Sequence, residues 1–247
     1  MSSSRGEDPP PVEPSTGVPI PGSATDPGRG SRGASETFTA ADLVAVVARA
    51  ERLLLRNREL LDRLDAELGD GDHGENMSAG FADAVRETAV GTDADIGDLL
   101  RRLGHLLVAG VGGAGGSLYG TAFIEAGIAV AGLPILAPED TARALDAAAE
   151  GVARRGRCRL GDKTIYDALR PAADAFSEAI NAGLGQQAAV VAAIRAARDG
   201  MHATTPLVAR RGLALRLGER SRGHRDPGAT SCYLLVRSLL ASGTRAR

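Results

Sequence analysis

Three aspartates lie close together in a glycine-rich stretch of the sequence. Asp65, Asp70 and Asp72 are five and two residues apart, and three glycines separate or follow them within residues 65–76. Glycine lets the chain turn tightly enough for the carboxylates to converge. Carboxylates this close raise one another's pKa unless a cation lies among them, and hard divalent cations such as Mg²⁺ prefer carboxylate oxygens. The spacing therefore predicts a magnesium site.

Two other interpretations of the acidic stretch are open. A calcium loop of the D-x-D-x-D-G type is the nearest, but the glutamate that its twelfth position requires is missing. The second is an acidic turn in solvent that caps the following helix. His73 follows the carboxylates at an expected helix start, which favours contact with a ligand over the structural role that a lone histidine usually has.

Two further segments place glycines at expected helix starts. The run over residues 110–120 precedes an apolar helix, and backbone N–H groups there can bind an anion. This run is neither a Walker motif nor a dinucleotide fingerprint, because its spacing differs and no strand precedes it. Near the C-terminus, Asp226 is expected to be an N-cap with Pro227 at the first helical position. Gly228–Thr230 would then face phosphate or base.

The apolar periodicity predicts an all-α domain of eight helices with no strand. Thr39 and Asp42 resemble a capping box at its start. Tyr233–Val236 is apolar enough for a strand but lies inside a helical pattern, and the stretch 211–227 is expected to be a loop, in which Glu219 and Arg220 form structural ion pairs. The expected helices cover about 39–64, 76–89, 95–109, 117–131, 138–155, 163–182, 186–203 and 228–242.

The N-terminal part of the sequence differs from the rest. Met1–Ser35 contains seven of the twelve prolines, with many serines and glycines. Such a segment cannot bury enough apolar surface to offset its ordering entropy. We therefore expect a disordered leader over residues 1–37, as a solvated tail rather than a docking segment, ahead of a domain over residues 38–247.

Composition excludes several classes of protein. The 247 residues carry a formal net charge of -2 and are 3% aromatic with no tryptophan, which argues against nucleic acid as a partner. No signal peptide or apolar run of membrane-spanning length occurs, so we expect a cytoplasmic chain without a membrane partner. Cys158 and Cys232 form neither a disulfide framework nor a metal cluster, and we interpret both as plain thiols.

Three motifs, in this order, resemble the nucleotide-binding L domain of dihydroxyacetone kinases, the DhaL or Dak2 type. They are LDAELGDGDHGENM, GVGGAGGSLYG with GDKTIYDAL, and LGERSRGHRDPGAT, and the resemblance covers about residues 38–243. It implies an eight-helix antiparallel barrel closed at one end by a Mg-nucleotide site.

The resemblance also implies which residues form that site. Asp65, Asp70 and Asp72 match aspartates that hold two Mg²⁺ ions, and these ions hold the phosphates of ADP or ATP. No catalytic residue is expected in this chain, because the acceptor is bound covalently by a histidine of the partner K subunit. The positions that match those lining the nucleotide are His73, Gly74, Asn76, Ala114, Gly115, Gly156, Ile165, Gly228, Ala229 and Thr230.

The implied function is that of a phosphotransfer subunit. It would pass a phosphoryl group from the Mg-bound nucleotide to dihydroxyacetone on a DhaK-type subunit, with a DhaM-type phosphodonor of the phosphoenolpyruvate-dependent phosphotransferase system recharging the ADP. Three alternatives are open: a subunit of a split ATP-dependent ketose kinase, a non-catalytic nucleotide-sensing regulator, and a degenerate scaffold for a K-type partner. A homodimer is also open.

Two positions depart from the family pattern. Gly115 stands where the family usually has serine, and Leu213 stands where it usually has arginine. Losing a hydroxyl and a guanidinium from a phosphate site removes ~1.5–3 kcal/mol of charged hydrogen bonding each. The candidates to compensate are Ser117, Arg210 and Arg216.

Overall fold

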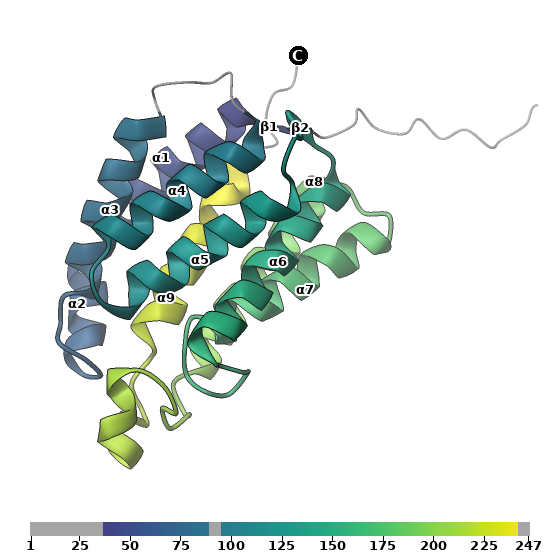
Figure 1. Ribbon diagram of the computed structural model, residues 1–247. Coiled ribbons are helices and arrows are strands. Elements are labelled where there is room, and N and C mark those ends of the chain that lie inside the picture. Colours follow the sequence, from purple (N-terminus) through teal and green to yellow (C-terminus); the bar gives the residue numbers. More distant parts are fainter. Residues whose placement is uncertain (1–36, 89–94, 242–247) are drawn as a thin grey trace, which may run out of the picture. The chain divides into compact units, whose positions relative to one another are not determined.

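The computed structural model describes residues 37–88 and 95–241 of the chain. The expected leader over residues 1–37 lies outside this part apart from Thr37, so its disorder stays a prediction. The described part contains nine α-helices (Figure 1). They are α1 (Ala40–Arg56), α2 (Arg58–Ala66), α3 (His73–Thr88), α4 (Ile96–Gly110), α5 (Gly113–Ala129), α6 (Pro138–Gly156), α7 (Tyr166–Asn181), α8 (Gln186–Ala203) and α9 (Pro227–Ser238).

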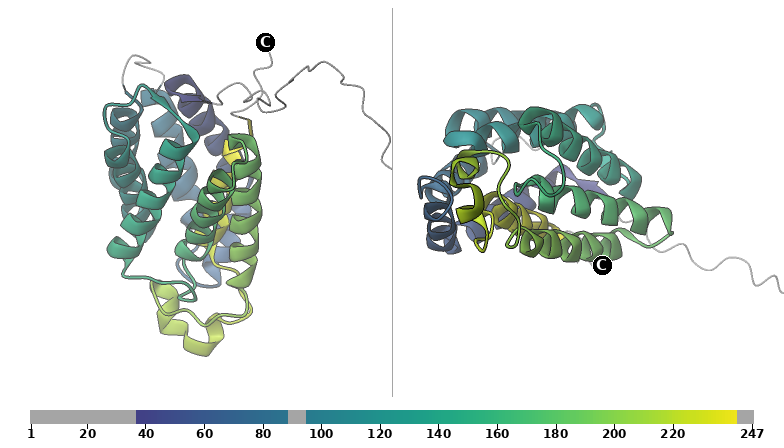
Figure 2. Two further views of the ribbon diagram at one scale, coloured as in Figure 1. Left: turned by 90° about the vertical axis from the view of Figure 1, so that its right-hand side faces the viewer. Right: turned by 90° about the horizontal axis from the view of Figure 1, so that it is seen from below.

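Eight of these helices form a closed ring. From α3 to α9 each helix packs against the next, α9 packs against α1, and α1 packs against α3, while α2 lies against α3 and α9 (Figure 2). Apolar side chains from all eight ring helices line one cavity of about 170 Å³, among them Phe81, Leu145 and Leu235. The prediction of an all-α, eight-helix barrel is confirmed.

The first expected helix is two helices in the structure. Asn57 separates α1 from α2, and its side-chain amide donates to the carbonyl oxygen of Leu53 at 2.8 Å. A side chain that bonds to a backbone carbonyl competes with the regular helix ladder, which explains the break. The expected capping box at the start of α1 is present, since Asp42 N donates to Thr39 Oγ1 and Thr39 N to the Asp42 carboxylate.

The expectation of no strand was wrong. Phe38–Thr39 (β1) pairs antiparallel with Ile135–Leu136 (β2), and two residues are too few to produce an alternating pattern that sequence could reveal. The stretch 211–227 was also expected to be a loop, yet it contains a 3₁₀ helix, η1 (Leu213–Ser221), interrupted at Gly218; a shorter one, η2 (Leu239–Ala241), follows α9. The apolar stretch Tyr233–Val236 is helical, as expected.

The ion pairs expected in η1 are present in part. Glu219 forms one, with Arg222 at 3.0 Å, whereas Arg220 has no ion-pair partner among the described residues. A spacing of three residues brings two side chains to one face of a helical turn, whereas adjacent residues diverge.

The direction of the helices decides where the motifs meet. Because successive ring helices run alternately, the connections 67–72, 111–112, 157–165 and 204–226 all lie at one end, the lower end in Figure 1. The acidic stretch, the glycine-rich run and the C-terminal motif belong to these connections. In the described part, no helix is both long and apolar enough to cross a membrane.

Candidate functional site

The three aspartates meet between α2 and α3. Asp65 is in the last turn of α2, and Asp70 and Asp72 follow in the connection to α3, where Gly71 adopts a left-handed conformation with φ +85°. One carboxylate oxygen from each aspartate lies within 4.8 Å of the others. Such a cluster of exposed and half-buried carboxylate oxygens fits the ligand preference of Mg²⁺.

Asp65 anchors this cluster. Its Oδ2 accepts hydrogen bonds from the backbone N–H groups of Gly71 (2.9 Å) and Asp72 (3.2 Å), which fixes the turn. Burial raises the pKa of the Asp65 carboxyl, and the neighbouring Asp70 raises it further against the lowering effect of these two hydrogen bonds. A cation among the three carboxylates would remove the repulsion that Asp70 contributes.

His73 is the first residue of α3, and hydrogen bonds link its side chain to α9 and, through Ser231, to α5. Its Nε2 lies 2.8 Å from Ser231 Oγ in α9, and that hydroxyl lies 2.7 Å from the Tyr119 hydroxyl of α5. Burial lowers the pKa of His73 to about 4, against the raising effect of nearby carboxylates, so the imidazole is neutral at neutral pH. The hydrogen-bonded chain therefore fixes the orientation of an uncharged ring.

A pocket of about 340 Å³ opens beside the aspartates. Its wall comes from the four connections at this end of the ring and from the helix ends next to them. The structure thus brings together segments that are as much as 163 positions apart, from Asp65 to Gly228. The expected site residues that line it are Asp65, Asp70, Asp72, His73, Asn76, Ala114, Gly115, Gly156, Ile165 and Gly228.

Gly74, Ala229 and Thr230, which the resemblance also places at the nucleotide, are not among the residues that line this pocket. All three are buried. A Cβ on Gly74 would lie 2.2 Å from the carbonyl oxygen of Arg58, so glycine is needed there for α2 to approach α3. Thr230 Oγ1 donates to the carbonyl oxygen of Asp226 at 2.7 Å. Gly74 and Thr230 thus take part in packing and hydrogen bonding at the starts of α3 and α9, and a contact of these residues with nucleotide stays a prediction.

Lys163 is a pocket residue that the sequence reasoning did not single out. It is only 2% exposed, and its Nζ donates to the carbonyl oxygens of Thr204 (2.7 Å) and His224. These bonds tie both ends of the segment 204–226 to the α6–α7 connection. The motif GDKT was the signal, but it indicated family membership and not this structural role.

Asp226 is the second residue missed as part of the pocket, since it was expected only as an N-cap. It does cap α9, accepting from Ala229 N at 2.7 Å. Burial raises the pKa of its carboxyl to about 7, and Asp167 adds to this while Lys163 opposes it. Because burial dominates, the pocket holds a carboxyl group that is protonated much more readily than an exposed aspartate.

The residues expected to replace the missing serine and arginine are only partly in place. Ser117 lines the pocket, whereas Arg210 and Arg216 do not; Arg155 and Arg211 line it instead. The Arg211 Nε donates to the carbonyl oxygen of Arg157 at 2.7 Å and lies 3.3 Å from the buried Asp162 carboxylate. Arg211 is therefore held by protein groups.

Comparison with known proteins identifies the family. Residues 67–241, most of the chain, match the DAK2 domain. The chain belongs to the DAK2 family. Within it, the chain is of the DhaL type: it is 39% identical over 181 residues to the "PEP-dependent dihydroxyacetone kinase, ADP-binding subunit DhaL" of Escherichia coli (strain K12), covering 73% of this chain and 86% of that protein.

This DAK2 chain also resembles part of longer kinases. It is 36% identical over 203 residues to the L-erythrulose 1-kinase of Mycolicibacterium smegmatis, covering 81% of this chain and 35% of that protein. The crystal structure of the dihydroxyacetone kinase from C. freundii in complex with AMP-PNP and Mg²⁺ shares the fold, with a TM-score of 0.64 and 23% identity, over 94% of this chain and 38% of that one. The family membership makes this chain a relative of dihydroxyacetone kinase subunits.

Proposed function

We propose that the chain binds ADP or ATP with two Mg²⁺ ions and passes a phosphoryl group to dihydroxyacetone held on a separate DhaK-type subunit. The observation that carries the proposal is the convergence of Asp65, Asp70 and Asp72 at the rim of a pocket of about 340 Å³. The names of two relatives agree with it: the E. coli protein is an ADP-binding subunit, and the C. freundii enzyme was crystallised with AMP-PNP and Mg²⁺.

The pocket combines groups that suit a nucleoside diphosphate. The three aspartates would hold the metal ions, which when bound spread the charge of the transferring phosphoryl group. The first N–H groups of α5, at Gly113–Gly115, point out of a helix start, where an anion is favoured. His73, neutral and fixed by Ser231, offers a hydrogen-bonding nitrogen without adding charge.

The acceptor and the phosphodonor are part of the same proposal. The family resemblance implies that a histidine of the K subunit binds the acceptor, so the ketose would be presented at the pocket mouth by that second subunit. The E. coli relative is named as phosphoenolpyruvate-dependent, which favours recharging of bound ADP by a DhaM-type protein. The L-erythrulose 1-kinase relative is named as a kinase without mention of phosphoenolpyruvate. It favours a second candidate function, in which the chain is a subunit of a split ATP-dependent ketose kinase.

Two departures support the third candidate, a regulator that binds nucleotide without transferring phosphate. Leu213 lines the pocket and is 47% exposed, so an apolar side chain faces the space in which the family has a guanidinium. Gly115 supplies no hydroxyl. The cytoplasmic location and a homodimer stay predictions.

Calorimetric titration of the nucleotide-stripped chain with ADP and ATP, with and without Mg²⁺, tests the proposal. We expect binding that requires Mg²⁺, and we expect Asp70→Asn to abolish it while the circular dichroism spectrum is unchanged, because the amide oxygen lacks the negative charge that holds the cation. Asp83→Asn is the matched control, since Asp83 lies on the surface of α3 and pairs with Arg86. Unchanged MgADP affinity in Asp70→Asn would show that the site is assigned wrongly.

Assays of phosphoryl transfer to dihydroxyacetone separate the three candidates: the subunit with recharged ADP, the subunit of an ATP-dependent kinase, and the regulator. A chain with bound MgATP that phosphorylates dihydroxyacetone on the DhaK-type subunit in repeated turnovers supports the ATP-dependent kinase. Turnover that requires phosphoenolpyruvate and the phosphotransferase proteins supports the recharged form. Binding of MgADP without transfer under either condition leaves the regulator.

A further inference from the structure

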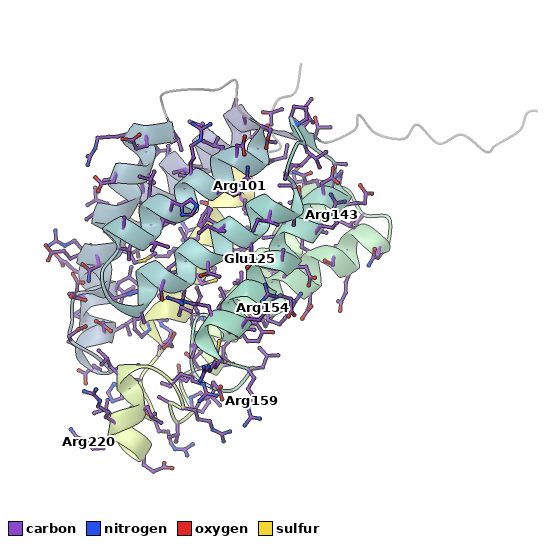
Figure 3. The ribbon with its side chains drawn as sticks, viewed as in Figure 1. Arg101, Glu125, Arg143, Arg154, Arg159 and Arg220 are labelled. Atoms are coloured by element: carbon purple, nitrogen blue, oxygen red, sulfur yellow. The ribbon has the colours of Figure 1, made fainter. Side chains whose placement is uncertain are left out.

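Exposed arginines gather in two segments that supply part of the pocket lining. The segments are residues 154–160 at the end of α6 and residues 210–222 around η1, and we call these arginines the arginine collar. Arg155 and Arg211 line the pocket, and in Figure 3 Arg159 and Arg220 lie at the end of the ring opposite Arg101 and Arg143. The members are Arg154, Arg155, Arg157, Arg159, Arg210, Arg211, Arg216, Arg220 and Arg222, and all nine are exposed.

The collar is positive although the chain as a whole is not. The formal net charge of the chain is -2, yet the only acidic residue within the two segments is Glu219. Some of the arginines are paired, with Glu125, Asp162 or Glu219. Among the described residues no ion pair involves the side chains of Arg155, Arg157, Arg210, Arg216 and Arg220. These five arginines leave unpaired positive charge on the two segments, while the exposed carboxylates of Asp70 and Asp72 line the same pocket from the α2–α3 connection.

Exposed leucines lie among these arginines. Leu160 is 53% exposed, Leu213 47% and Leu215 54%. Arginine together with apolar side chains is typical of protein interfaces, in which the apolar groups are desolvated and the arginines bind carboxylates. Nucleic-acid surfaces of this kind use aromatic side chains for stacking, and the chain is only 3% aromatic. The composition of the rim favours a protein with an acidic face.

We propose that the arginine collar docks an acidic face of the subunit that carries the phosphoryl acceptor. This inference rests on the proposed function, because only then must a second protein meet the pocket mouth. Opposite charges around the mouth accelerate encounter and set the orientation of the partner. A partner seated on both segments covers the pocket, which excludes water from the transferring phosphoryl group.

Charge reversal at two collar positions tests this docking surface. Arg216→Glu/Arg220→Glu changes two unpaired arginines that do not line the pocket, and Arg102→Glu/Arg195→Glu makes the same change in net charge at exposed positions of α4 and α8. The probe is the purified dihydroxyacetone-binding subunit of the same organism, titrated calorimetrically against the MgADP-loaded chain at low and high salt. We expect the collar variant to bind it at least about tenfold more weakly with a reduced salt dependence, and the control variant to bind like the unchanged chain.

MgADP affinity, measured on each variant, separates the two proposals. The collar variant should bind MgADP as tightly as the unchanged chain does. If the unchanged chain itself does not bind MgADP, the proposed function is wrong. The docking proposal alone is wrong in two cases. In the first, the chain binds MgADP but does not bind the dihydroxyacetone-binding subunit. In the second, this subunit binds the collar variant as tightly as it binds the unchanged chain. Binding of RNA or DNA that the collar variant loses, with subunit binding unaffected, would also overturn it in favour of a nucleic-acid surface.

Discussion

Leu213 lies on the pocket lining with 47% of its surface exposed. At this position an apolar side chain gains little from burial and donates no hydrogen bond to a phosphate. The side chain of Arg211 does not replace the missing guanidinium freely, because it is bound to Arg157 and Asp162. In the proposed site, phosphate binding would therefore depend mainly on the aspartates and the helix starts.

Restoring the arginine should strengthen nucleotide binding. We expect Leu213→Arg to raise MgADP affinity by about tenfold or more, since a charged hydrogen bond contributes ~1.5–3 kcal/mol. Leu215→Arg adds the same charge at a position of η1 that does not line the pocket, and serves as the control in calorimetric titration. Equal affinities for the two variants and the unchanged chain would show that no phosphate oxygen comes near residue 213.

At the level of elements, the segment 204–226 connects two ring helices and forms part of the pocket wall. Lys163 ties it at Thr204 and His224, and Asp226 N donates to Thr204 Oγ1 at 3.0 Å. Asp226 is buried beside these groups, and its carboxyl pKa is raised to about 7, chiefly by burial. The protonation of one carboxyl group is thus linked to the stability of this segment.

The link predicts a pH dependence of folding in the absence of metal. Between about pH 4 and 7 the folded chain binds more protons at Asp226 than the unfolded chain does. The contribution of Asp226 to the free energy of unfolding therefore falls as pH rises. We expect Asp226→Asn, which keeps an N-cap side chain, to remove a decline of a few kcal/mol in urea unfolding with EDTA across that range. The same decline in Asp226→Asn would assign it to other groups.

At the level of the whole described domain, the ring has a single continuous core. Phe81 is 1% exposed and packs edge to face on Phe123, with ring centroids 6.3 Å apart. The ring closes only because α9 returns to α1, where Arg49 Nε donates to the Ser238 carbonyl oxygen at 2.8 Å. The four connections that form the pocket are positioned by this closure.

A core substitution should therefore lower stability without changing the binding groups. We expect Phe81→Ala to reduce the free energy of unfolding by about 3–5 kcal/mol, measured by urea denaturation, because it removes a fully buried ring. Leu184→Ala, at a residue that is 53% exposed, should change it by less than about 0.5 kcal/mol. The folded fractions of both variants should bind MgADP with the same affinity. A lower affinity in Phe81→Ala alone would mean that the core around Phe81 helps to position the pocket residues.

Sequence alone was sufficient for the features that depend on local spacing. The helical periodicity, the caps at Thr39 and Asp226, and the convergence of three aspartates across flexible glycines each depend on a few neighbouring residues. The motif resemblance then identified the family. The break at Asn57, the two-residue strands and η1 were missed because each is set by a single side chain or by a contact with a distant segment.

Only the tertiary structure decided which neighbours of a motif face the pocket. Gly228 lines it, whereas Ala229 and Thr230 are buried, because consecutive residues of a helix start point in different directions. Lys163 and Asp226 likewise obtain their burial and their partners from segments far away in the sequence. The sequence by itself determined which chemically active residue types the motifs contain. Closure of the ring determined which of their side chains line the pocket, because burial depends on contacts between segments that are far apart in the sequence.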